Sequence, residues 1–109
     1  MSYEYKLVFD DASAAQHVMS MIKRSKACIR AENGDIYLKD KSLSNHADYD
    51  VRLIDEGDGS LWLQVNVNSV DLYTLVRETL RGKAFKCFED GDAEDEVELN
   101  EAFRLKPNR

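Results

Sequence analysis

The chain has few of the features that mark secreted scaffolds and membrane proteins. Among its 109 residues there are two cysteines, Cys28 and Cys87, which are too few for a dense disulfide framework. Its longest uninterrupted apolar stretches are three residues, as in Leu61 to Leu63, whereas a membrane-spanning helix needs about 20. Residues 1–6 have neither the basic leader nor the apolar run of a signal peptide. We therefore expect one soluble, cytoplasmic domain, spanning residues 1–109, that does not bind a membrane.

Negative charge is distributed unevenly along the chain. The formal net charge is −6, and eight of the 21 acidic residues fall between positions 89 and 101, where there is no lysine or arginine. These eight residues are Glu89, Asp90, Asp92, Glu94, Asp95, Glu96, Glu98 and Glu101. A cationic partner would relieve their mutual repulsion, part of which salt screens. The run is either a solvated loop that aids solubility or a surface for a basic molecule, and both interpretations stay open.

Hydrophobic periodicity predicts the elements of the first half of the chain. Alternation over 3–9 predicts a strand, and an apolar stripe at helical spacing follows an N-cap at Asp10 or Asp11 and ends near Lys26. The pair Asn33-Gly34 favours a type I′ turn between strands 28–32 and 35–39. Residues 40–48 are mostly polar and lack periodicity, which predicts a loop.

The second half of the chain predicts a longer hairpin, a helix and a strand. Alternation over 49–53 and 61–67 predicts two strands, with a turn at 55–59 between them. Asn68 or Ser69 is expected to cap a helix that Gly82 ends, and 83–88 is expected to be a strand. For the last element we favour a helix around Leu99, Ala102 and Phe103, and a bulged strand through Val97, Leu99, Phe103 and Leu105 is the alternative.

These elements predict an α+β fold with a mostly antiparallel sheet. The order is β-α-β-β-β-β-α-β followed by the C-terminal element, and the two amphipathic helices are expected to cover one face of the sheet. Side chains alternate along a strand, so Tyr49, Val51 and Leu53 are expected to point at the helices. The same alternation places four side chains on the open face, namely Trp62, Tyr37, Arg52 and Ile54. Trp, Tyr and Arg are enriched among interface hot spots, which favours a partner there, and the alternative is that the C-terminal element folds over Trp62.

The residue types that carry catalysis or hold metals are sparse. Cys28 and Cys87 fall in predicted strands, where a buried, unreactive thiol is the more common role. His46, Asp48 and Asp50 have a spacing that could present an acid–base pair or metal ligands, although such a cluster arises easily by chance. Asp90, Asp92 and Glu101 match positions 1, 3 and 12 of a calcium loop, but Asp95 stands where that loop needs glycine. We expect no enzyme activity, no metal site and no cofactor.

In overall size, acidity and α+β layout the chain resembles small acidic immunity proteins of bacterial toxin–immunity pairs, as in contact-dependent growth inhibition systems. The resemblance rests on these properties and on no motif. It implies a cytoplasmic inhibitor that forms a one-to-one complex with a basic toxin, such as a ribonuclease.

The residues themselves favour a binding protein whose carboxylates occupy a basic groove that normally binds phosphates. The residues expected to bind the partner are Glu89, Asp90, Asp92, Glu94, Asp95, Glu96, Glu98, Trp62, Tyr37 and Arg52. One alternative is a domain that binds single-stranded nucleic acid, with Tyr37 and Trp62 stacking on bases and Arg52, Lys6 and Arg30 near phosphates. The second alternative is a small enzyme that uses His46 and Asp48.

Overall fold

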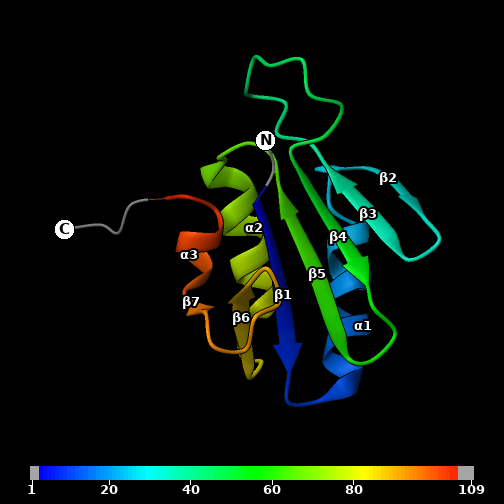
Figure 1. Ribbon diagram of the computed structural model, residues 1–109. Coiled ribbons are helices and arrows are strands. Elements are labelled where there is room, and N and C mark those ends of the chain that lie inside the picture. Colours follow the sequence, from blue (N-terminus) through cyan, green and yellow to red (C-terminus); the bar gives the residue numbers. More distant parts are fainter. Residues whose placement is uncertain (1–2, 106–109) are drawn as a thin grey trace.

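Seven strands form one antiparallel sheet in the computed structural model, which describes residues 3–105 (Figure 1). The order of strands across the sheet is β2-β3-β4-β5-β1-β6-β7, so the N-terminal strand lies near the centre. The strands are β1 (Tyr3–Phe9), β2 (Cys28–Glu32), β3 (Asp35–Leu38), β4 (Val51–Asp55), β5 (Ser60–Val65), β6 (Phe85–Glu89) and β7 (Glu96–Val97).

Three helices lie on one face of this sheet, and the other face carries no helix within residues 3–105 (Figure 1). They are α1 (Ala12–Lys23), α2 (Val70–Leu80) and the short α3 (Leu99–Ala102). The predicted α+β class and the helical covering of one face are confirmed. The C-terminal element is a helix, as favoured, but the two-residue strand β7 precedes it and closes the sheet beside β6.

Local chemistry explains where the elements begin and turn. The Asp11 side chain accepts a hydrogen bond from the backbone N–H of Ser13 and caps α1, and Ser69 caps α2 by accepting from the N–H of Leu72. Asn33 and Gly34 both have positive φ, 52° and 84°, as the predicted type I′ turn requires. The short turn therefore holds β2 against β3.

The core lies between the sheet and the helices, and alternate residues of the strands point into it. Tyr5 and Leu7 of β1 and Leu61, Leu63 and Val65 of β5 are all buried. The stripe predicted for α1 is buried as well, through Ala15, Val18, Met19 and Ile22. The arrangement leaves Tyr5, Leu7 and Phe9 of β1 and Leu61, Leu63 and Val65 of β5 inside, and it places Glu4, Lys6, Trp62 and Gln64 on the opposite, open face.

Some predicted boundaries were wrong by a few residues. Helix α1 ends at Lys23 and not near Lys26, because the backbone N–H groups of Arg24 and Ser25 donate to the carbonyl oxygens three residues back, and the Ser25 hydroxyl also donates to that of Ile22 (2.7 Å). Strand β5 ends at Val65, so Val67 is only half-buried and lies outside the sheet. Strand β3 ends at Leu38 and not at Lys39, whose side chain donates to the carbonyl oxygen of Ala47 in the loop that follows.

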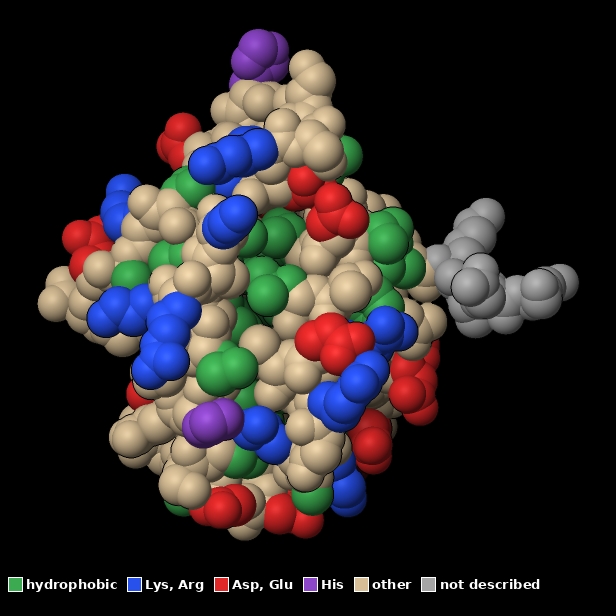
Figure 2. Space-filling view, turned by 180° about the vertical axis from the view of Figure 1, so that it is seen from behind, with side chains coloured by type: hydrophobic (Ala, Val, Ile, Leu, Met, Phe, Trp, Pro, Cys, Tyr) green, Lys and Arg blue, Asp and Glu red, His purple; other side chains and the backbone are tan. Residues whose placement is uncertain are grey.

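Positive charge clusters at the C-terminal end of α1 on the helical side of the molecule. Figure 2 shows this side of the molecule, where lysine and arginine side chains are interspersed with aspartate and glutamate. The stretch 12–26, which holds α1, contains three basic residues, Lys23, Arg24 and Lys26, and no acid. The C-terminal end of α1 is therefore basic, whereas the acidic segment, residues 89–96, lies at the β6–β7 edge of the sheet.

Candidate functional site

Strand register determines which side chains share the open face. In one row across the sheet Tyr37 lies opposite Arg52, Arg52 opposite Gln64 and Gln64 opposite Glu4. A second row contains Ile54, Trp62, Lys6, Phe88 and Glu96. The structure thus places Trp62, Tyr37, Arg52 and Ile54 on one face, which agrees with the alternation read from the sequence.

At the β3–β4 end of this face, aromatic and arginine side chains pack on one another. The guanidinium carbons of Arg30 and Arg52 lie 4.0 and 5.2 Å from the centre of the Tyr37 ring. Both arginines already have carboxylate partners, because Arg52 forms an ion pair with Asp35, and Arg30 lies 3.4 Å from Glu32. The hydrogen bond to Asp35 also raises the pKa of Arg52, so its charge is permanent. This end of the face is electrostatically paired within the chain.

Tyr49 belongs to the same cluster, and its predicted inward position was wrong. Its ring packs edge-on against Tyr37 with 5.1 Å between ring centres, and its hydroxyl donates to Oε1 of Gln64 (3.0 Å). The strict alternation fails because β4 begins only at Val51, so Tyr49 lies before the strand and is free of its period. The open face consequently has two tyrosines at this end.

Trp62 joins the open face to the acidic segment. Its indole N–H donates to Oε1 of Glu4 (2.8 Å), and the backbone N–H of Asp90 donates to the carbonyl oxygen of Glu4 (2.9 Å). Gly91 lies so close to the ring that a Cβ there would be 3.1 Å from Cζ3 of Trp62. The connection between β6 and β7 therefore lies across the indole, which leaves it only partly exposed. The covering segment is this connection, and not α3, which lies on the helical face.

The connection itself is an ordered turn. Asp90 and Gly91 have positive φ, 53° and 74°. Oδ1 of Asp92 accepts from the N–H of Glu94 (2.9 Å), and the carbonyl of Asp95 accepts from the N–H of Glu89 (2.9 Å). These bonds hold the backbone of the acidic segment in one conformation, so the backbone positions from which its carboxylate side chains extend are fixed.

Five carboxylates form what we call the acidic rim: Asp90, Asp92, Glu94, Asp95 and Glu96. All five residues are exposed, and within residues 3–105 none of them lies within ion-pair distance of a lysine or arginine. The neighbouring acids differ. Glu89 lies 3.9 Å from Arg104, and Oε1 of Glu101 accepts from the N–H of Glu98 in the first turn of α3. The sequence run of eight acids is therefore divided into an unpaired rim and flanking residues with local roles.

The predicted binding residues fall into two groups on the sheet. The rim lies at the β7 edge and Tyr37 and Arg52 lie on β3 and β4, with Trp62 on the central strand β5 between the two groups. Five strand spacings separate β3 from β7, or roughly 24 Å at about 4.8 Å per strand. A partner that buries about 800 Å² on this protein would reach both groups.

The residues proposed for catalysis do not come together. His46 and Asp48 are exposed in the loop 40–50, whereas Asp50 is fully buried. Oδ1 of Asp50 lies 3.3 Å from Nζ of Lys39, and its Oδ2 accepts from the N–H of Asp40 (2.8 Å). Within the described residues, His, Cys, Asp and Glu side chains form no group of three that could hold a metal ion. Asp50 thus anchors the loop.

Asp40 completes this buried polar network, which the sequence reading missed. Its carboxylate accepts hydrogen bonds from the hydroxyls of Ser42 and Ser69, both 2.6 Å. These bonds, that from Ser42 foremost, lower the pKa of Asp40 below its usual value. Lys39 donates further bonds to Oδ1 of Asn45 and the carbonyl of Ala47. In the sequence, only Lys39 followed by a loop that contains Asp and Asn residues could have indicated this network.

Neither cysteine has the surroundings of a nucleophile. Burial, with the charges of Glu101 and Glu96, raises the pKa of the Cys87 thiol to about 12. Cys28 is half-buried, and its thiol lies 3.6 Å from the carbonyl oxygen of Arg30. Cys87 is therefore a protonated core residue at neutral pH.

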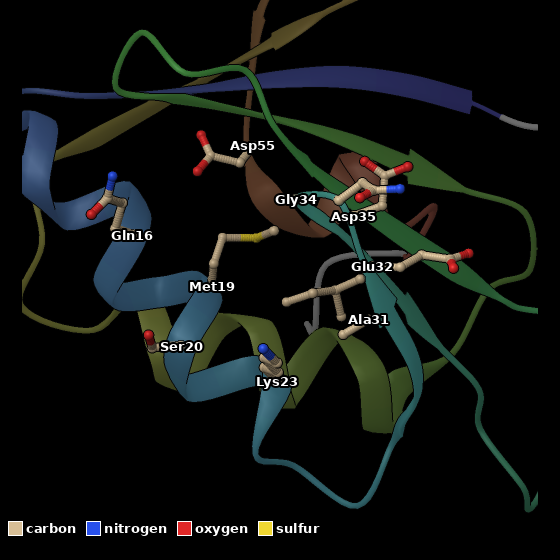
Figure 3. Close-up of a pocket in the computed structure, with 11 residues that line it drawn as sticks. Gln16, Met19, Ser20, Lys23, Ala31, Glu32, Gly34, Asp35 and Asp55 are labelled. Carbon is tan, nitrogen blue, oxygen red and sulfur yellow. The ribbon is translucent and has the colours of Figure 1, made fainter.

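A cavity on the helical side was not predicted either. It lies between α1 and the β2–β3 hairpin, has a volume of about 400 Å³, and is lined by 11 residues that include Met19, Lys23, Ala31 and Asp55 (Figure 3). Met19 projects from α1 toward the hairpin. No sequence pattern predicts this cavity, because it depends on the orientation of the β2–β3 hairpin relative to α1.

Comparisons of the chain with protein-family models, curated proteins and solved structures give no match in any of the three. Across residues 3–105, no helix has both the length and the apolar character that a membrane crossing requires. The functional assignment accordingly depends on the residues and their geometry.

Proposed function

We propose that this protein binds and neutralises a basic protein, and that it acts as an immunity protein which blocks the cleft of a nuclease toxin. The observation that carries the proposal is the acidic rim, whose five exposed carboxylates are held on an ordered turn beside Trp62 without a lysine or arginine partner in the described chain. Nuclease clefts bind phosphates, and carboxylates can occupy the same basic positions.

The energetics of the rim favour association with a cation. Like charges within about 8 Å repel one another at physiological salt, so a basic surface relieves a cost that the free protein carries. Complementary charge also accelerates encounter toward about 10⁸ M⁻¹s⁻¹ at low salt. The turn is already ordered by the bonds of Asp92 and Asp95, so less conformational entropy is lost on binding than for a flexible acidic tail.

Trp62 has a positioning role in this proposal in addition to contact with the partner. Its indole supports Gly91 and is itself oriented by Glu4, so the rim is tied to the centre of the sheet. The half-buried ring edge, together with Tyr37 and Arg52, supplies apolar and aromatic area for the interface.

The experiment begins with the neighbouring reading frame, which is expected to encode a secreted protein with a basic C-terminal domain. That domain is co-expressed with this protein, and survival of the cells measures neutralisation. The rim variant carries Asp92→Asn, Glu94→Gln, Asp95→Asn and Glu96→Gln. The amide oxygen that Asp92→Asn introduces preserves the acceptor of the turn.

The matched control removes four charges elsewhere, at the exposed residues Asp10, Asp48, Glu56 and Asp71. We expect the control to protect cells as the wild type does and the rim variant to lose protection. Equal protection by the rim variant and the control would refute a role for the rim.

A second function is favoured by one observation, the exposed stack of Arg30 on Tyr37. Such a stack resembles the aromatic and arginine surfaces that bind single-stranded nucleic acid. Both Arg30 and Arg52 are, however, neutralised by Glu32 and Asp35, and the rim would repel phosphates. Fluorescence anisotropy with a labelled single-stranded RNA distinguishes the two functions, because the immunity proposal expects no binding at physiological salt.

A further inference from the structure

Strand β2 ends the sheet with an unpaired edge. It hydrogen-bonds with β3 on one side, and within residues 3–105 no strand pairs with its other side. Four of its five residues are exposed, and Ile29 is 46% exposed. At the opposite end of the sheet the edge strand β7 is only two residues long. An exposed edge with free backbone groups is a template for another strand.

The hairpin geometry determines which backbone groups of β2 are free. A two-residue turn closes on a hydrogen-bonded pair, here Glu32 with Asp35, and the ladder then alternates. The N–H and C=O of Glu32 and Arg30 consequently point toward β3, and those of Ala31 point away from the sheet. Ala31 is therefore the centre of the available edge.

We propose that β2 pairs with β2 of a second copy of this chain, antiparallel and centred on Ala31. A two-fold axis and the outward direction of Ala31 allow pairing about Arg30, Ala31 or Glu32. Pairing about Arg30 or Glu32 places two like charges directly opposite each other, which is destabilising. Pairing about Ala31 places Arg30 of each copy opposite Glu32 of the other, so charge selects this register.

The side chains around the axis fit this arrangement. Arg30 and Glu32 lie on the same face, 3.4 Å apart, and the side chain of each is 57% exposed. Pairing surrounds each arginine with two carboxylates and produces a square of alternating charge. On the helical face the two Ala31 methyl groups meet beside the cavities that Ala31 lines, so no bulky group obstructs the seam.

The contact is short, because the register of β2 shifts between Cys28 and Arg30. We therefore expect a weak dimer that forms at about 0.1–1 mM, as is usual for small interfaces. Directly opposite residues share a face, so both open faces lie on one side of a continuous sheet and the two acidic rims lie at its far ends. Each copy remains free to bind one basic partner, and the dimer does not depend on the proposed function.

Sedimentation velocity from about 10 µM to about 1 mM tests the proposal on the full chain. Arg30→Glu and Glu32→Arg each place like charges across the seam, and we expect each to weaken the dimer at least about tenfold. The double variant Arg30→Glu/Glu32→Arg restores opposite charges and is expected to restore the dimer. Lys86→Glu, at an exposed strand position of β6 far from β2, is the matched control and is expected to dimerise as the wild type does.

A further variant, Ala31→Pro, tests the pairing without a change of charge, in case a charge variant fails to fold. It removes an N–H that the monomer does not use, so we expect a folded monomer by circular dichroism. A wild type that stays monomeric at about 1 mM overturns the proposal. So does a dimer that survives Ala31→Pro, or a double variant that fails to regain what the single variants lose.

Discussion

Two polar segments, 40–50 and 89–96, each contain several acidic residues but differ in how far these residues are buried and paired. In the first, Asp40 and Asp50 are buried, and both are satisfied by Lys39, by serine hydroxyls or by backbone N–H groups. In the second, the five carboxylates of the acidic rim are exposed, and within the described residues none of them has a cation. The comparison shows that the role of an acidic residue depends on where its hydrogen-bond and ion-pair partners lie, and not on how many acids its segment contains.

The partners of the first segment are distant in sequence. Asp50 meets Lys39 across the loop, and Asp40 meets Ser69 at the start of α2, so folding itself uses these charges. The second segment is held by backbone hydrogen bonds, by the bond that the Asp92 side chain accepts and by the contact of Gly91 with Trp62, and the charges of the acidic rim are available to another molecule. Substitutions in the two segments should therefore have contrasting effects on stability.

The largest loss of stability is expected for Lys39→Met. It leaves the fully buried Asp50 without its cation, and breaking a buried pair in this way costs about 3 kcal/mol of the free energy of unfolding. Urea denaturation followed by circular dichroism measures the loss. The control Lys41→Met changes an exposed lysine of the same loop and should leave the midpoint almost unchanged. Equal effects of the two substitutions would contradict the contrast.

Gly91→Ala should have the next largest effect. Its positive φ disfavours any side chain, and the new Cβ would lie 3.1 Å from the Trp62 ring, so we expect a loss of about 2 kcal/mol. Gly57→Ala is the matched control, since φ there is +79° and a Cβ meets nothing within 4 Å. Gly57→Ala isolates the backbone cost, about 1 kcal/mol. If both glycines gave the same loss, the turn would not lie on the indole.

Low pH should reduce the contribution of Asp40, in the first segment, to the free energy of unfolding. The folded pKa of Asp40 is lowered by the hydroxyls of Ser42 and Ser69, so its contribution is complete above its unfolded value of about 4 and is lost as the pH falls through the folded pKa. We expect Asp40→Asn to cost about 1 kcal/mol at pH 7 and the difference from the wild type to shrink below about pH 4. Thermal unfolding between about pH 2.5 and 7 measures this difference. A gap that is constant over this range would show that the carboxylate charge is irrelevant.

The smallest change in stability is expected for the rim variant that replaces Asp92, Glu94, Asp95 and Glu96. Removing mutually repelling, exposed charges should change the free energy of unfolding by less than about 0.5 kcal/mol, with any change toward greater stability at low salt. The same urea titration at two salt concentrations measures it. A loss above about 1 kcal/mol would mean that the rim supports the fold.

Most of the fold could be predicted because it follows from local patterns. The stripe of α1, the caps Asp11 and Ser69 and the Asn33-Gly34 turn each involve residues within a few positions of one another. Alternation also placed Trp62 outward. It failed at Tyr49, which precedes the strand and is positioned by Tyr37 and Gln64 from other strands.

The geometry of the candidate site was less accessible to sequence reasoning. The sequence showed that 89–101 is acidic, but not that Gly91 lies on Trp62 or that Glu89 has Arg104 nearby. These contacts join segments that are far apart in the sequence or cross from β6 to the C-terminal region, and no periodicity encodes them. The Lys39–Asp50 pair was missed for the same reason.

The most direct test of the central claim is calorimetric titration of the basic partner domain with this protein and its rim variant over a range of salt concentrations. We expect the rim variant to bind at least about tenfold more weakly at low salt and to show a flatter dependence of affinity on salt, because several charge contacts are lost. The control variant at Asp10, Asp48, Glu56 and Asp71 should bind as the wild type does. Unchanged affinity and unchanged salt dependence in the rim variant would contradict the claim that these carboxylates bind the partner.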